Sequence, residues 1–387
     1  MGSMAKIFKE NTTKYSMVIA LVGIMIFFQI ASGGILLKPL NITNLILQNS
    51  YILILAIGML LVIVAFQIDL SVGSVAAVIG ALAAILIVNN HVPVALGIII
   101  SLAAGAVIGA FQGYWIAYVR IPAFITTLAG MLIFRGLTYV ALKGTSIAPF
   151  PSSFQKMSTG FIPDFFKGQG LHITTLVIGL ILTGLYIFYE ISNRKTQRKY
   201  DFEVLAKGLL IVKMAAIIAV LNIFFYALAV YKGIPNVLVL LLVLIGFYTF
   251  LTTKTTIGRH IYALGGNEKA ARLSGIKTKK VIFLVFVNMG VLAALSGLVF
   301  AARLNSATPN AGSNFELDAI AACFIGGAST AGGIGTIMGA IIGGLVMGVM
   351  NNGMSLIGVG IDWQQTIKGL VLLIAVAFDV YSKSKTI

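Results

Sequence analysis

Long runs of apolar residues, separated by short polar segments, repeat along almost the entire chain. In a helix, about 20 predominantly apolar residues cross a bilayer core, and only helices and closed barrels satisfy all of their backbone hydrogen bonds in lipid. The pattern predicts an all-α polytopic transmembrane bundle of about 12 spans, with about 10 as the lower bound. The expected spans are 15–32, 43–66, 70–88, 94–118, 122–142, 173–189, 209–230, 235–252, 281–302, 316–333, 334–352 and 364–381.

The run at 316–333 is the least regular of these spans. It is short, it begins with Glu316 and Asp318, and it contains the pairs Gly326-Gly327 and Gly332-Gly333. Non-helical backbone is tolerated at membrane depth only where protein or a cavity covers it. We therefore expect one broken or re-entrant segment near 316–333.

Composition and charge support the same class of protein. Hydrophobic residues make up 59% of the chain and charged residues 10%, so a fully water-exposed surface would aggregate and lipid must cover most of it. A net charge of +16 would suit nucleic acid, but the basic residues cluster in a few loops between apolar runs. This clustering is typical of cytoplasmic loops. It predicts cytoplasmic N- and C-termini and no nucleic-acid partner.

The chain is expected to form a single transmembrane domain, residues 1–387. Its first three residues, which precede Met4, resemble an added leader and are left out of the fold prediction. We expect an external loop at 143–172, a basic cytoplasmic loop at 190–207 and a second cytoplasmic loop at 253–280.

Glycines recur at helical spacing in two of the spans. Residues four apart lie on one face of a helix, and small residues allow the close backbone approach that drives helix association in lipid. Two helix-packing faces are therefore predicted, one formed by Gly105, Gly109 and Gly113 and the other by Gly335, Gly339 and Gly343.

The sequence contains no recognisable catalytic or metal-binding constellation. His91, His172 and His260 are scattered without metal-ligand spacing, and no phosphate-binding Gly-x-x-x-x-Gly-Lys-Ser/Thr motif occurs. Neither an enzyme nor a chain that binds ATP through that motif is expected. Arg135 lies within a span and is costly there unless it is paired. We expect Arg135 to be structural, with Asp69, Glu316 and Asp318 as candidate partners.

The cytoplasmic segment 258–276, GRHIYALGGNEKAARLSGI, has the signals of a short helix. Gly265-Gly266 is expected to interrupt the chain, and Asn267 suits an N-cap. Glu268 and Arg272 are spaced for an i,i+4 ion pair. Gly275 suits the left-handed position that follows a helix. A helix over about 268–274 is marginal alone in water, so it needs a partner surface, either another protein or lipid headgroups.

This segment resembles the cytoplasmic motif of permeases in the ribose/xylose/galactose class of bacterial ABC sugar importers. IDLSVGS at 68–74, IPAFITTLAGMLIFRG at 121–136 and ELDAIAACFIGGASTAGGIGT at 316–336 are similar to further signatures of that class, in the same order. The additional region 190–230 is more similar to the xylose and multiple-monosaccharide permeases. Phe66-Gln67 departs from the small or polar residues common before IDLSVGS, so Gln67 is expected to alter substrate preference if it lines the pathway.

The resemblance implies a multi-pass, homodimeric permease of the bacterial inner membrane that is itself no enzyme. An extracellular or periplasmic sugar-binding protein would deliver xylose, galactose, glucose, arabinose or ribose. A cytoplasmic ATPase, which carries the ATP-Mg, would drive transport, while this chain would bind no cofactor and no metal. The resemblance assigns ATPase coupling to Gly265, Gly266, Asn267, Glu268, Ala270, Ala271, Arg272, Leu273, Ser274 and Gly275.

A sugar pathway needs hydrogen-bonding groups and aromatic faces without strong charge. The polar candidates in the spans are Gln67, Asp69, Ser71, Gln112, Trp115, Asn288, Asn351 and Asn352. Each could instead form interhelical hydrogen bonds. Asp69 could also cap the following helix or pair with Arg120 or Arg135, and an interfacial anchor is the favoured role of Trp115. Two other functions remain open, an ABC permease for nucleosides or another small polar solute and an ion-coupled secondary transporter.

Overall fold

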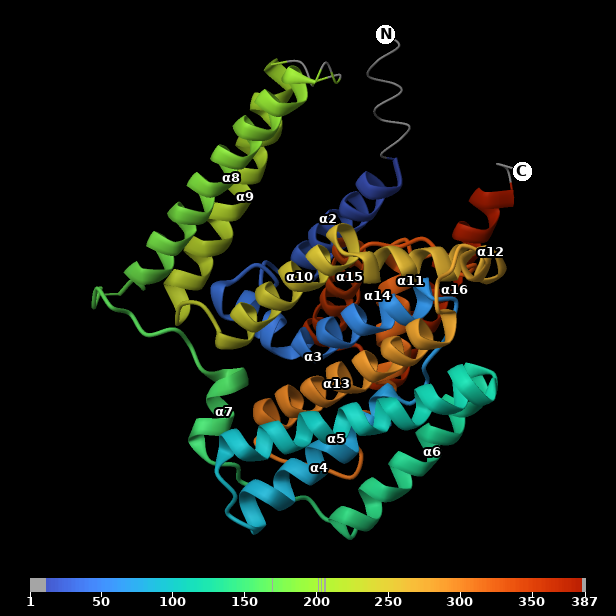
Figure 1. The fold of residues 1–387 in the computed structure, drawn as a ribbon. Coiled ribbons are helices and arrows are strands. Elements are labelled where there is room, and N and C mark those ends of the chain that lie inside the picture. The colour runs from blue at the N-terminus through green and yellow to red at the C-terminus, as the bar shows by residue number, and fades with distance from the viewer. Residues whose placement is uncertain (1–11, 169, 201, 203, 205–206, 385–387) are drawn as a thin grey trace.

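The computed structural model describes residues 12–168, 170–200, 202, 204 and 207–384, and these fold into an all-α bundle (Figure 1). Two isolated β-bridges, Ile147 with Ala307 and Phe161 with Pro235, join connecting segments. The helices are α2 (Thr12–Ala31), α3 (Pro39–Val64), α4 (Val72–Ala84) with the π-helical turn η1 (Ile85–Asn89), α5 (Val94–Tyr114) with η2 (Trp115–Val119), α6 (Ala123–Leu142), α7 (Ser152–Thr159), α8 (Ile173–Lys199), α9 (Lys207–Tyr231), α10 (Asn236–Lys254), α11 (Thr256–Gly266), α12 (Glu268–Leu273), α13 (Thr278–Leu304), α14 (Phe315–Ile325), α15 (Ile337–Leu356) and α16 (Ile361–Ser384).

Nine helices in the described part of the chain are long and apolar enough to cross a membrane. They are α3, α4 with η1, α5 with η2, α6, α8, α9, α10, α13 and α15, and each coincides with a predicted span. The helical bundle is thereby confirmed. A shorter apolar stretch, Met17–Ala31, belongs to α2.

The predicted break near 316–333 is present. Helix α14 ends at Ile325, and irregular backbone continues to Thr336, where the side chain of that threonine caps α15. Gly327, Gly332 and Gly333 have positive φ angles in this stretch. Because such angles are readily adopted only by glycine, the glycine pairs seen in the sequence are what allow the chain to leave the helix.

The predicted soluble segments contain more helix than expected. Helix α8 continues to Lys199, so the prediction of a loop is wrong for 190–199. Arg198 and Lys199 occupy its last turn, where positive charge complements the helix dipole. Helix α7 lies within 143–172, and α11 and α12 occupy most of 253–280.

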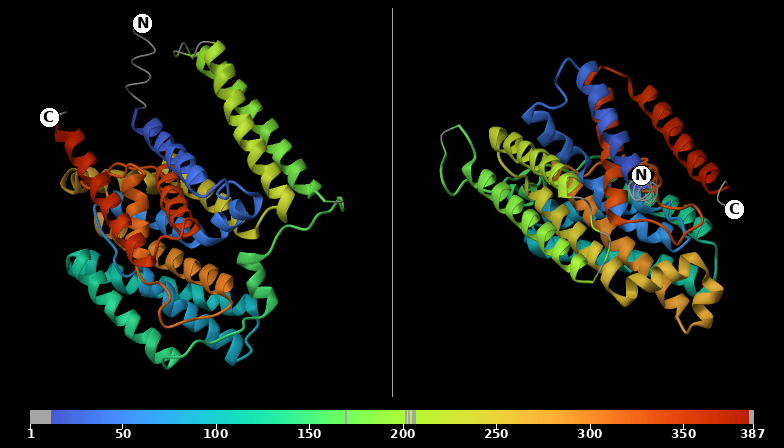
Figure 2. Two further views of the ribbon diagram at one scale, coloured as in Figure 1. Left: turned by 180° about the vertical axis from the view of Figure 1, so that it is seen from behind. Right: turned by 90° about the horizontal axis from the view of Figure 1, so that it is seen from above.

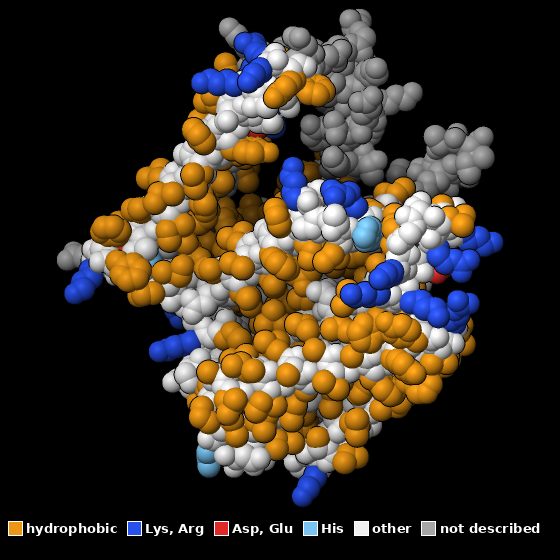
Figure 3. Space-filling model, in the orientation of Figure 1, with side chains coloured by type: hydrophobic (Ala, Val, Ile, Leu, Met, Phe, Trp, Pro, Cys, Tyr) orange, Lys and Arg blue, Asp and Glu red, His pale blue; other side chains and the backbone are white. Residues whose placement is uncertain are grey.

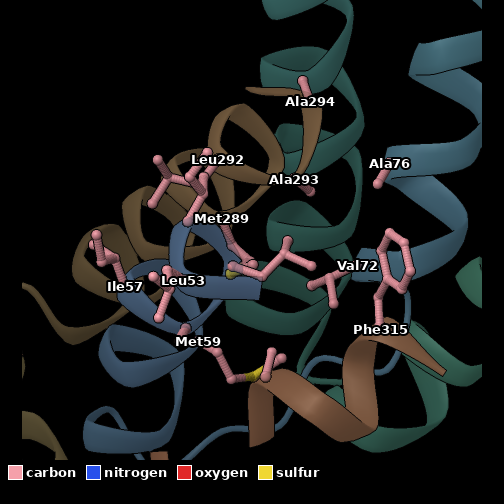
Figure 4. Close-up of a cluster of buried hydrophobic side chains, with 14 of the residues drawn as sticks. Leu53, Ile57, Met59, Val72, Ala76, Met289, Leu292, Ala293, Ala294 and Phe315 are labelled. Carbon is pink, nitrogen blue, oxygen red and sulfur yellow. The ribbon is translucent and has the colours of Figure 1, made fainter. Parts of the chain in front are cut away.

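Helix α3 forms the centre of the bundle. Its most apolar window is 83% buried, compared with 6% for α9. Figure 4 shows Leu53 and Ile57 of α3 close to Met289 and Leu292 of α13, while Phe315 lies beside Val72 and Ala76. These side chains bring α3, α4, α13 and the start of α14 into one core.

The first predicted glycine face packs as expected. A Cβ atom on Gly109 would lie 2.3 Å from the carbonyl oxygen of Phe286, and one on Gly105 would lie 2.6 Å from that of Gly290. Gly113 faces Phe283 in the same way, so α5 lies directly against the backbone of α13.

The second predicted face is only partly correct. Gly339 and Gly343 lie on α15 against α14, where a Cβ on Gly343 would be 2.0 Å from the carbonyl oxygen of Ala322. Gly335 precedes α15, in the irregular segment, and lies against the side chains of Leu60 and Val64. The four-residue spacing of the glycines therefore extends to a residue that lies before the N-terminal end of α15.

Helices α8 and α9 form a hairpin that extends away from the bundle (Figures 1 and 2). Its base is fixed by Asp164, whose carboxylate accepts hydrogen bonds from the backbone of Gly168, Ile173 and Thr174, and from the Thr174 hydroxyl at 2.7 Å. Partial desolvation acts to raise the pKa of Asp164, but these hydrogen bonds outweigh it and hold the pKa well below its ordinary value.

Candidate translocation and coupling site

A polar network lies where the chain breaks between α3 and α4. Phe66 has a φ of 59°, which ends α3. The carboxylate of Asp69 accepts hydrogen bonds from the backbone nitrogen of Ser71 at 2.8 Å and from its hydroxyl at 2.6 Å. Gln112 of α5 donates to the same hydroxyl at 2.7 Å. Asp69 therefore orders the turn before α4 without acting as its N-cap, which is Ser71. Through Gln112, the network connects the break to α5.

The other pathway candidates lie in different surroundings. Asn352 and Asn41 exchange two side-chain hydrogen bonds, of 2.8 and 3.1 Å, between α15 and α3. Asn288 accepts a hydrogen bond from the Tyr248 hydroxyl, between α13 and α10. Both asparagines thus have the interhelical role that was the alternative to lining a pathway.

Trp115 is exposed and packs edge-on against Phe111 and Tyr114. This surface aromatic cluster fits an interfacial anchor. Asn351 is half-buried, and its side-chain oxygen has no hydrogen-bond partner among the described residues.

Arg135 forms no ion pair with its candidate partners Asp69, Glu316 and Asp318 among the described contacts, although its charge acts on the Glu316 carboxylate. Its guanidinium donates to the backbone carbonyls of Pro309 and Ala311, in the segment between α13 and α14. Irregular backbone leaves carbonyls without helix partners, and a guanidinium offers five N–H donors to them. The structural role expected for Arg135 therefore rests on carbonyl acceptors.

Asp318 pairs instead with Lys368 of α16, at 3.0 Å. Both side chains are at most one-fifth exposed, so this ion pair fixes α16 to α14 inside the bundle. Lys368 lies in the predicted span 364–381. Its partner Asp318 is 50 positions away in the sequence, so the spacing of residues along the chain could not predict this ion pair.

The short helix expected over about 268–274 forms nearly as predicted, as α12. The Asn267 side chain accepts a hydrogen bond from the backbone nitrogen of Ala270 at 2.9 Å, and Gly275 has a φ of 85° after the helix. The expected ion pair between Glu268 and Arg272 is absent among the described contacts, and both side chains are exposed. Leu273, 87% exposed, projects from the same helix.

Gly265 and Gly266 do not interrupt the chain, because both belong to the last turn of α11. Their small size serves close packing instead. A Cβ on Gly265 would lie 1.6 Å from the carbonyl oxygen of Val64, and one on Gly333 would lie 2.8 Å from the Cα of Gly266. The backbone nitrogen of Gly333 donates to the same Val64 carbonyl at 2.9 Å.

This contact among Gly265, Gly266, Val64 and Gly333, here called the glycine seam, joins three segments. It connects the end of α11 to the end of α3 and to the irregular segment after α14. The Tyr262 hydroxyl adds a 2.6 Å hydrogen bond to the carbonyl of Gly335. The segment that leads into α12 therefore touches both breaks in the membrane helices through backbone.

A cavity of about 630 Å³ opens beside this seam. Its lining includes Gln67 next to the α3–α4 break and Glu268 and Arg272 on α12. The lining also includes Arg120, which the sequence suggested only as a partner of Asp69. Arg120 has a φ of 67°, and the chain turns there at the end of η2. The following Pro122 was the signal that a helix ends there. The cavity brings Gln67, alone of the pathway candidates, next to the predicted coupling helix.

Comparison with known proteins gives consistent matches over most of the chain. The family model for the permease component of the branched-chain amino acid transport system matches residues 41–376. The xylose transport system permease protein of Haemophilus influenzae is 41% identical over 383 residues, which cover 99% of this chain and 100% of that protein. The corresponding Escherichia coli protein is 36% identical over 385 residues, covering 100% and 96%. The ribose import permease protein of Escherichia coli is 35% identical over 339 residues, covering 88% and 85%. No solved structure matches significantly.

Proposed function

The chain belongs to the family of transport permease components whose model spans residues 41–376, and we propose that it is the transmembrane subunit of an ATP-driven importer for a monosaccharide. It is a multi-pass protein of the bacterial inner membrane. The substrate class is proposed from relatives named for xylose and for ribose transport. Those names give no support to a nucleoside permease or an ion-coupled transporter.

The finer topology is part of the proposal. Twelve crossings are obtained when α2, α14 with its irregular continuation, and α16 are added to the nine long helices. The start of α2, the end of α16 and α12 lie toward the same side of the bundle (Figures 1 and 2). Basic side chains gather on that side in Figure 3, as expected for a cytoplasmic surface.

The observation that carries the proposal is the glycine seam. Helix α12 would seat in a groove of a separate ATPase, with the exposed Leu273 as its apolar contact. Movement of α12 would be transmitted through Gly265 to the end of α3 and to the segment after α14, because their backbones are in direct contact. Two interrupted helices would then shift together, beside the cavity that contains Gln67.

The remaining partners follow from the same proposal. A sugar-binding protein would deliver the substrate from outside, and a second copy of the chain would complete the pathway. ATP and Mg²⁺ would be bound by the ATPase, so this subunit would contribute no catalytic group. Gln67 would offer a neutral hydrogen-bonding group in the cavity, whereas Ser71 and Gln112 are buried and bonded to each other.

Reconstitution tests the function directly. The chain is placed in liposomes with the ATPase and sugar-binding protein of its own transport system, and uptake of radiolabelled xylose, ribose and a nucleoside is measured. Uptake of a monosaccharide that requires all three proteins and Mg-ATP is expected. Leu273→Asp should abolish co-purification of the ATPase, whereas Leu273→Met should retain it. Uptake driven by an ion gradient without the ATPase would reject the proposal.

A further inference from the structure

A second cavity, of about 440 Å³, opens between α10, α11 and α13. Its inner wall is apolar and includes the buried side chains Leu61, Ile261 and Val285. Ile257 and Leu284 line it as well and are 50% and 41% exposed, so the cavity is open at the surface. Its volume lies within the roughly 300–1,000 Å³ of sites that enclose one small molecule or part of a larger one.

One face of α13 gives this groove a chemical gradient. Lys277 and Lys280 lie at the mouth, Leu284 and Val285 follow one turn later, and Asn288 follows at the next turn. Lys280, Leu284 and Asn288 are four residues apart and so lie on one side of α13, whereas Lys277 is the N-cap residue just before the helix. About 12 Å of helix separates Lys280 from Asn288, and between them Leu284 and Val285 give the groove an apolar middle section below its cationic mouth.

The positive charge at the mouth is not neutralised within the described chain. Lys277 and Lys280 are exposed, and neither forms an ion pair with a described carboxylate. His260 lines the same groove. Figure 3 shows basic side chains gathered over the region of α11 and α12, directly above a broad hydrophobic band. The groove lies at this boundary.

We propose that the groove binds an anionic glycerophospholipid of the cytoplasmic leaflet. The phosphate lies against Lys277 and Lys280, and one acyl chain enters between α10 and α13 toward Asn288. The opposite charges attract, since a basic residue near an anionic lipid surface contributes favourably to binding. A sugar fits less well, because most of its hydroxyl groups would meet the apolar inner wall formed by Leu61, Ile261 and Val285. This assignment rests on the proposed topology, in which α12 and the mouth of the groove face the cytoplasm. It adds a lipid-binding site to the proposed transport function.

The site has a direct connection to the coupling segment. Gly275, Ile276 and Lys277 form both its edge and the link from α12 to α13. A bound lipid therefore restrains the link through which α12 is attached to the bundle, and anionic lipid supports coupling between the ATPase and the permease.

Native mass spectrometry of the purified full chain tests the site. Phosphatidylglycerol is titrated against phosphatidylcholine with matched acyl chains. We expect preferential retention of phosphatidylglycerol, weakened about tenfold or more in K277Q/K280Q. Lys280→Gln and Lys279→Gln form the matched pair, because Lys280 lines only this groove and Lys279 only the other cavity, whereas Lys277 lines both. Leu284→Trp should reduce binding of both lipids by filling the groove.

Three results would overturn the proposal. The first is equal binding of the two lipids, and the second is an equal loss of phosphatidylglycerol binding in the Lys279→Gln control. The third is a dimer of the chain that retains no lipid and that dissociates in the Leu284→Trp variant, which would show that a second copy occupies the groove. Because lipid retention is measured without ATPase or sugar, these outcomes are independent of whether the chain transports a monosaccharide.

Discussion

The central bundle and the α8–α9 hairpin are almost equally apolar, yet they are built differently. Mean hydropathy is 2.2 for the best window of α3 and 2.4 for that of α9, but burial is 83% and 6%. In the bundle, glycines let helix backbones touch, as Gly109 does against Phe286. In the hairpin, Gly179 of α8 lies against the side chain of Phe225 on α9 rather than against its backbone, and a Cβ placed on Gly184 would meet no atom of another segment within 4 Å. Similar hydropathy therefore accompanies two kinds of packing, with direct backbone contact at glycines in the bundle and mostly exposed helix surface in the hairpin.

The largest effect is expected at the glycine seam. Gly265→Val should abolish ATP-driven uptake, because its side chain would occupy the position of the Val64 carbonyl. Gly246→Val, on α10 and outside the seam, is the matched control, since a Cβ there would meet no atom within 4 Å. Uptake in proteoliposomes is the measurement, with ATPase co-purification recorded in parallel. Normal uptake by Gly265→Val would show that the seam does not link the coupling segment to the membrane helices.

A matched pair of glycine substitutions tests the comparison itself. Gly109→Val should destabilise the chain by about 1–3 kcal/mol, the usual cost of overpacking. Gly184→Val in the hairpin should leave stability unchanged, because nothing lies near its new side chain. Thermal unfolding in detergent measures both. Equal effects of the two substitutions would mean that the bundle and the hairpin do not differ in packing.

The polar network at the α3–α4 break should show a smaller effect. Asp69→Ala leaves the Ser71 backbone nitrogen without its acceptor, which costs about 1–3 kcal/mol. Asp69→Asn keeps an acceptor oxygen and should recover most of that loss. Thermal unfolding is again the readout. If Asn destabilises as much as Ala, the charge of Asp69 matters more than its hydrogen bonds.

The smallest effect is expected at the base of the hairpin. Asp164→Ala should speed hydrogen exchange in 161–175 about tenfold, with no effect on the bundle, because the carboxylate orders the start of α8. Lys167→Gln, in the same loop, is the control.

The pH dependence at Asp164 follows from the direction of its pKa. A lowered pKa means that the stabilising charge is present at every pH above the unfolded value, near 4, and is lost only as the pH falls through the lower folded value. Protection of 161–175 should therefore be the same at pH 7 and pH 5, after correction for intrinsic exchange. A loss of protection by pH 5 would contradict the role of Asp164.

Local signals in the sequence predicted much of this fold. Apolar run length located the nine long helices, and Asn267 with Gly275 marked both ends of α12. Glycine pairs located the break after α14. Each of these depends on neighbours along the chain, which a single sequence contains.

Contacts between distant segments could not be predicted in the same way. Lys368 pairs with Asp318, and Arg135 binds the carbonyls of Pro309 and Ala311, because the tertiary fold brings them together. The roles of Gly265 and Gly266 were missed for the same reason. Glycine favours both chain breaks and close packing, and only the position of Val64 decides between them.

The glycine seam also bears on how rigidly α11 is connected to the end of α3. Side chains absorb small displacements by changing rotamer, but at Gly265 one main chain rests on another and nothing can rotate aside. A displacement of α11 toward α3 would therefore be expected to move the end of α3 as well, whereas a displacement away from it would break the contact between Gly265 and Val64. Such a contact is rigid and leaves no room for a larger side chain at Gly265, as the proposed coupling of α12 to the two breaks in the membrane helices requires.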